Sequence, residues 1–197
     1  MSDPHANGHA PGPAGPPSTA RYVPGTGEIH RHVIVAIVRN RPGVLNRVAS
    51  LLRARNFNIE SLAVGHTENP DVSRMTIALK GDDYGVEQVS KQLYRLIDVL
   101  KVQDVSAERR VEHELALIKV RASNGNRAEI LKLVELSRGR VVDVAADSVV
   151  VEATGSPDEV EALVALLGGY GIKELVRTGS VVLLRGSQSI EHEGANR

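Results

Sequence analysis

Residues 40–45, with the sequence Asn-Arg-Pro-Gly-Val-Leu, are the chain's clearest candidate for ligand chemistry. The amide of Asn40 can donate to a carboxylate or accept from an ammonium group. Pro42 fixes the backbone where a helix would begin, and Gly43 lets a ligand approach the main chain closely. The N–H groups of a helix start favour an anion. The stretch fits a small-molecule site, although Asn40 could equally serve only as a helix cap and Gly43 only as a turn residue.

His30 and His32 stand two residues apart, so they would share one face of a strand and could bind a metal ion. Because no third ligand stands nearby, we interpret the pair as a solvated strand edge and expect no metal site. Asp82 and Asp83 fit a turn before a helix, where carboxylates complement the helix dipole.

Catalytic patterns are missing from the 197 residues. The chain has no cysteine, which excludes disulfides and thiol chemistry, and it contains neither a P-loop nor a nucleophile elbow. Lys plus Arg and Asp plus Glu both number 24, and aromatic residues make up 3%. A neutral chain with few stacking side chains argues against nucleic-acid binding. No apolar run is long enough to span a bilayer, so we expect no membrane partner and a cytoplasmic location.

The strands and helices that carry these residues are predicted in the order strand, helix, strand, strand, helix, strand. Strands are predicted at 32–39, 57–65, 73–80 and 101–106. The two helices between them are predicted from apolar residues at helical spacing, which are Val44, Leu45, Val48, Leu51 and Leu52 in one and Val86, Val89, Leu93, Leu96 and Ile97 in the other.

The same order returns in the second half of the chain. Strands are predicted at 113–121, 140–145, 148–153, 172–176 and 181–185, with helices at 125–137 and after a capping box that starts at Ser156. We therefore predict an α+β fold of two tandem ferredoxin-like βαββαβ modules, each an antiparallel sheet with helices on one face. The other face needs cover, which hints at oligomerisation.

Domain limits follow from composition. Residues 1–28 are rich in Pro and Gly and are predicted to be a disordered tail, as are residues 187–197. Residues 29–108 and 109–186 are the two predicted modules, and a chain ending at Glu108 is expected to keep the first one folded.

Several stretches resemble known proteins. Residues 40–45 resemble the opening of an ACT domain, an amino-acid-sensing module. Residues 57–64 and 73–77, together with 91–93 and 114–120, resemble the small regulatory subunit of acetolactate (acetohydroxyacid) synthase. The resemblance spans about residues 30–186.

This resemblance implies a non-catalytic subunit that binds and stimulates a large catalytic subunit. Thiamine diphosphate, Mg²⁺ and FAD are expected on that large subunit, and no cofactor is expected on this chain. The small subunit would confer feedback inhibition by valine, leucine or isoleucine within branched-chain amino acid biosynthesis.

In the resembling family, ACT domains pair side by side as a homodimer, and the amino acid lies at their interface. Arg39 departs from the family, many of whose members have an acidic residue there. The resemblance assigns effector binding to one protomer's Asn40, Gly43, Val44 and Leu45, and to the neighbouring protomer's Asn58 and Ile59.

Two alternatives remain. The chain could be a free-standing ACT-type sensor that regulates a different enzyme, or a small acylphosphatase-like hydrolase on the same fold. The hydrolase needs an Arg and Asn oxyanion cradle, whereas this loop carries a Pro-Gly helix start. The stretch 58–64 favours the regulatory subunit over the free-standing sensor.

Overall fold

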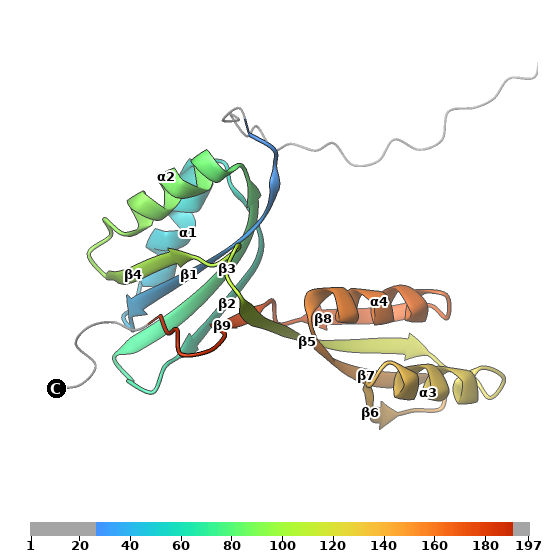
Figure 1. The fold of residues 1–197 in the computed structure, drawn as a ribbon. Coiled ribbons are helices and arrows are strands. Elements are labelled where there is room, and N and C mark those ends of the chain that lie inside the picture. Colours follow the sequence, from blue (N-terminus) through green and yellow to red (C-terminus); the bar gives the residue numbers. More distant parts are fainter. Residues whose placement is uncertain (1–26, 191–197) are drawn as a thin grey trace, which may run out of the picture.

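The computed structural model describes residues 27–190, which form two βαββαβ modules side by side (Figure 1). Most of the tail predicted for residues 1–28, and the end of the one predicted for 187–197, lie outside this range. In the first module, the antiparallel sheet has the order β2-β3-β1-β4, and both helices cover one of its faces. Its elements are β1 (His30–Arg39), α1 (Val44–Ala54), β2 (Asn58–His66), β3 (Val72–Gly81), α2 (Asp83–Leu93) and β4 (Val99–Asp104).

Alternation along β1 sends side chains to both faces of the first sheet. Ile34 and Ala36 point into the core beneath α1 and α2, whereas Val33 and Val35 point to the helix-free face. The helices bury Val44, Val48 and Leu52 from α1 and Val86, Val89 and Leu93 from α2.

Two residues predicted on the buried helix faces lie at the surface instead. Leu45 is 45% exposed because the buried stripe of α1 runs through every fourth residue from Val44, and the next residue is turned away from it. Ile97 is 86% exposed because α2 ends at Leu93, before Ile97 is reached.

The second module repeats the arrangement with the sheet order β6-β7-β5-β8. Its second helix begins with the predicted capping box, in which Ser156 and Glu159 bond each other's backbone. No helix within residues 27–190 is long and apolar enough to cross a membrane. The elements are β5 (Arg110–Arg121), α3 (Arg127–Leu136), β6 (Arg140–Val144), β7 (Ser148–Gly155), α4 (Pro157–Gly168), β8 (Ile172–Arg177) and β9 (Val181–Leu184).

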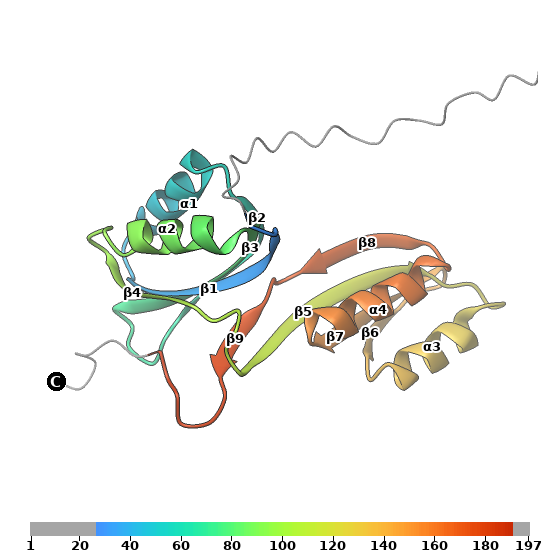
Figure 2. The ribbon, with the colours of Figure 1, turned by 45° about the horizontal axis from the view of Figure 1, so that its top comes forward.

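The sequence pattern predicted that β9 completes the second sheet beside its other strands. The structure shows a different pairing. The strand β9 pairs with residues 110–113 of β5, whereas β7 pairs with residues 114–121. The start of β5 and β9 thus form a two-stranded ribbon that leaves the second module and extends toward the first (Figure 2). Gly179, with φ 76°, allows the chain to turn between β8 and β9.

This ribbon covers the helix-free face of the first sheet. Val33 and Val35 of β1 pack in one buried cluster with Val105, Val182 of β9 and Ile190. The cover that the sequence led us to expect from a partner is therefore supplied in part by the chain itself. Ile190, which the composition placed in a tail, is 6% exposed in this cluster.

Candidate ligand-binding site

The loop between β1 and α1 is tied to the turn between β2 and β3. The backbone N–H of Asn40 donates to the carbonyl of Asp71 at 2.7 Å. Its side-chain Nδ2 donates to the carbonyl of Pro70 at 2.9 Å and lies 3.3 Å from Nδ1 of His66. These bonds use the donors of Asn40 and leave its amide oxygen as an acceptor for an ammonium group.

The start of α1 is open to a ligand. Gly43 is its N-cap residue, with φ 84°, and no side chain within the described part of the chain caps the helix. Among residues 27–190, a Cβ at Gly43 would meet only the Nη1 atom of Arg47, at 3.5 Å, so these residues leave the space beside Gly43 open. The first turn of α1 has no acidic residue. Its N–H groups and the helix dipole can therefore receive a carboxylate.

Two apolar residues follow Gly43 and have different roles. Val44 is buried and anchors the helix start in the core, whereas the exposed Leu45 can contact an apolar ligand side chain. Arg47 forms an ion pair with Asp98, so its guanidinium is already engaged beside the loop. Asn40, Gly43, Val44 and Leu45 thus lie together in the loop before α1 and in its first turn.

Asn58 and Ile59 lie at the other end of the same sheet. Asn58 pairs with Lys80 of β3, whereas the residue before Asn40 pairs with Val72. Lys80 stands eight positions after Val72 along β3, so the two residues are about 27 Å apart. Within one chain, Asn58 and Ile59 therefore do not reach the Asn40 loop.

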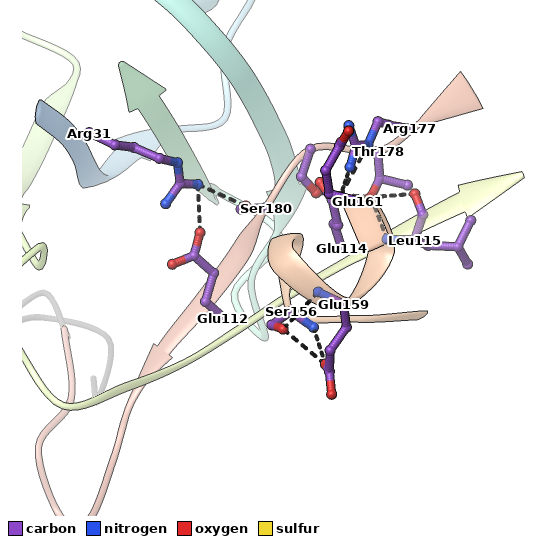
Figure 3. A network of polar contacts seen from close by, with 11 residues as sticks. Arg31, Glu112, Glu114, Leu115, Ser156, Glu159, Glu161, Arg177, Thr178 and Ser180 are labelled. Carbon is purple, nitrogen blue, oxygen red and sulfur yellow. Dashed lines mark hydrogen bonds and ion pairs between the residues drawn. The ribbon is translucent and has the colours of Figure 1, made fainter. Parts of the chain in front are cut away.

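Asn58 and Ile59 instead line a cleft between the two modules, with a volume of about 910 Å³. Polar contacts flank this cleft (Figure 3). Arg31 of β1 donates to the carboxylate of Glu112 at 2.6 Å and to the hydroxyl of Ser180 at 3.2 Å. Charged groups from both modules therefore contact each other beside the cleft.

The hydrogen-bond partners of Glu112 lower the pKa of its carboxyl group. Burial raises the pKa, but hydrogen bonds from Arg31, Ser180 and Arg110 outweigh this effect. Sequence reasoning missed this contact because Arg31 stands 81 residues before Glu112. No local spacing signals such a pair.

The histidine pair also differs from the prediction. His32 is 2% exposed, so it is not part of a solvated strand edge. A third potential metal ligand is present, because Asp83 at the start of α2 lies 3.3 Å from His30. Asp82 caps α2 by accepting from the N–H of Gly85, as its turn position predicted.

Comparisons with known proteins find a family match for each of the two modules. Residues 34–101 match the model of the AHAS small subunit-like ACT domain, and residues 113–186 match the model of the small subunit of acetolactate synthase. A probable acetolactate synthase small subunit from Archaeoglobus fulgidus is 52% identical over 158 residues, which are 80% of this chain and 99% of the relative. The chain belongs to the family of acetolactate synthase small subunits.

Further relatives agree with this assignment. The acetolactate synthase small subunit of Aquifex aeolicus is 48% identical over 85% of this chain and 87% of its own length. A crystal structure of the acetolactate synthase small subunit from Thermotoga maritima is 42% identical, with a TM-score of 0.74 over 81% of this chain and 99% of that one. The predicted family and the fold of two ferredoxin-like modules are thereby confirmed.

Proposed function

We propose that this small subunit regulates an acetolactate synthase by binding valine, leucine or isoleucine at the start of α1. The observation that carries this proposal is the uncapped helix start at Gly43, which lies beside the amide of Asn40. The helix start suits the carboxylate of an amino acid, and the amide oxygen suits its ammonium group. The exposed Leu45 suits an aliphatic side chain.

A second copy of the chain would complete this site. The strand β2 is an edge of its sheet, so its outer backbone groups can pair with another strand. If two β2 strands pair in antiparallel fashion about an axis at Leu62, Asn58 of one copy lies opposite His66 of the other. His66 lies beside Asn40, so Asn58 and Ile59 of one copy would reach the effector loop of the other.

This arrangement explains how binding can regulate. A ligand held by two protomers favours one arrangement of the dimer, and it shifts the equilibrium by its difference in affinity for the two arrangements. The partner that responds is the large catalytic subunit, which would carry thiamine diphosphate, Mg²⁺ and FAD. The small subunit itself contributes no catalytic residue in this proposal.

Reconstitution with the large subunit tests the proposal. Acetolactate production is measured with and without the small subunit, and with increasing valine, leucine or isoleucine. We expect stimulation by the small subunit and inhibition by at least one of the three amino acids. A chain that neither binds nor stimulates the large subunit, yet binds an amino acid in a calorimetric titration, would be a free-standing sensor instead.

Two variants locate the effector site. Asn40→Ala should relieve inhibition while stimulation is retained, and Gly43→Asp should do the same because it places a carboxylate where that of the ligand belongs. Asn124→Ala is the matched control, because Asn124 is exposed in the corresponding loop of the second module. Inhibition that persists in Asn40→Ala and Gly43→Asp would place the effector elsewhere.

A further inference from the structure

Three side chains of types that can bind a metal ion converge at the end of β1 that lies away from the Asn40 loop. His30 and His32 come from the start of β1, and Asp83 comes from the first turn of α2. One potential ligand atom from each lies within 4.8 Å of the others. Oδ1 of Asp83 lies 3.3 Å from Nε2 of His30 and 3.7 Å from Nε2 of His32.

The other ring nitrogen of each histidine is already engaged. Nδ1 of His32 lies 2.9 Å from the carboxylate of Asp104, and Nδ1 of His30 lies 3.2 Å from the carbonyl of Glu28. Both acceptors require a proton on Nδ1, which leaves the lone pair on Nε2. Protein metal sites use this arrangement to orient histidine ligands.

The burial of His32 argues that its Nε2 atom has a ligand. The side chain is 2% exposed, and Nε2 makes no hydrogen bond among the described residues. The distance to Asp83 is too long for a hydrogen bond but fits two ligands of one ion. With metal–ligand bonds of about 2.0–2.2 Å, neighbouring ligands in a tetrahedral site lie about 3.3–3.6 Å apart.

We propose that His30, His32 and Asp83 bind a divalent transition metal such as Zn²⁺, with water as a fourth ligand. Two imidazoles and one carboxylate suit Zn²⁺ better than Mg²⁺ or Ca²⁺, which take mainly oxygen ligands. The partial positive charge at the N-terminus of α2 disfavours a cation, but the negative charges of the Asp82 and Asp83 carboxylates offset this effect.

Metal binding would cross-link three elements of the first module. The ligands join the start of β1 to α2, and Asp104 joins this cluster to the end of β4. The adjacent Arg31 contacts the second module through Glu112. The metal would therefore stabilise the end of the sheet that contacts the second module, independently of amino-acid binding at Gly43.

Calorimetric titration of the metal-free full chain with Zn²⁺, and absorption spectra with Co²⁺, test the proposal. We expect one Zn²⁺ bound per chain at the site, a Co²⁺ spectrum typical of nitrogen and oxygen ligands, and a higher melting temperature with Zn²⁺. His30→Ala and Asp83→Ala should each weaken this binding at least about tenfold. Asp104→Asn should weaken it about 10–100-fold, as loss of a residue that orients a ligand does.

His5 and His9 precede the described residues and could bind Zn²⁺ themselves. The double variant His5→Ala/His9→Ala is therefore the control, and it should keep the site and the rise in melting temperature. His113→Ala, which removes an exposed histidine elsewhere, should also keep both. The proposal is overturned if His30→Ala binds Zn²⁺ as tightly as the unaltered chain, or if binding disappears only in the double variant.

Discussion

At the scale of single residues, Gly43 has a backbone conformation that other residues adopt only at a cost. Its φ of 84° lies in the left-handed region, where a Cβ crowds the following carbonyl. The nearest atom to an added Cβ is 3.5 Å away, so space is not the constraint. The glycine is therefore required by the backbone, and the open space above it is left for a ligand.

Gly43→Ala should lower the free energy of unfolding by about 1–2 kcal/mol through backbone strain alone. Urea denaturation measures this change. Gly168→Ala is the control, because Gly168 ends α4 with open space around it and no positive φ, and alanine should be neutral or slightly stabilising there. Equal effects of the two substitutions would contradict the role of φ.

Glu112 gives stability that depends on pH. Its pKa is lower in the folded chain than the value of about 4.3 expected for an unfolded one. The contribution is therefore complete above the unfolded-state pKa and is lost as pH falls through the lower folded-state pKa. Glu112→Gln should lower the free energy of unfolding by about 1–3 kcal/mol at neutral pH, because it weakens charge-assisted hydrogen bonds.

The measurement is urea denaturation of both chains from neutral pH down to about pH 3. The difference in free energy of unfolding between them should shrink as pH falls. Glu174→Gln, at an exposed position on β8, should show little difference at any pH. A difference that stays constant down to pH 3 would exclude the ionised carboxylate as its source.

At the scale of elements, β2 is one of the edge strands that could pair with a strand of another chain. It forms one edge of the first sheet, and Val64 near its end is 46% exposed. An exposed, apolar sheet edge is a ready site for pairing with another strand. The proposed site across two copies depends on this edge.

Val64→Asp should weaken the dimer and the inhibition by amino acid together, because it places a charge in the proposed interface. Size-exclusion chromatography with light scattering measures the first effect, and the reconstituted synthase measures the second. Leu136→Asp is the control, since Leu136 is equally apolar and 76% exposed on α3 of the other module. A dimer unaffected by Val64→Asp would place the interface elsewhere.

The order of helices and strands was predictable because it depends on local periodicity. The apolar stripe of α1 and the capping box at Ser156 are both visible within a few residues of sequence. The pairing of β9 was not predictable, because its partners on β5 lie about 70 residues earlier. The same holds for Asp83 beside His30: the sequence analysis expected no metal site because no third ligand stands near the two histidines in the sequence, and only the fold brings Asp83 to them.

At the scale of the whole molecule, the two modules are less separate than the sequence indicates. Val33, Val35 and Ile37 of the first sheet are buried together with Val182 of β9 and with Ile190, both of which follow β8 in the chain. The predicted domain limit near Glu108 cuts through this contact. Sequence repeats show where similar modules begin, but they contain no information on which module a shared strand stabilises.

A chain that ends at Glu108 should therefore be less stable than the sequence led us to expect. It would expose the apolar face of β1 that β9 and Ile190 cover, so we expect aggregation or a melting temperature well below that of the full chain. Calorimetry and light scattering measure both. A soluble truncated chain with the melting temperature of the intact protein would show that the ribbon adds little.

The ribbon of β5 and β9 also determines where the chain can be cut and rejoined. Topologically, the second module is an insertion into the first, bounded by His113 and Val181, which are direct partners across the ribbon. Antiparallel neighbours can be joined by a turn of two residues. Replacing residues 114–180 with an Asn-Gly turn should therefore yield a minimal sensing domain, and chimaeras that exchange second modules between relatives should be joined at these two positions and not at residue 108.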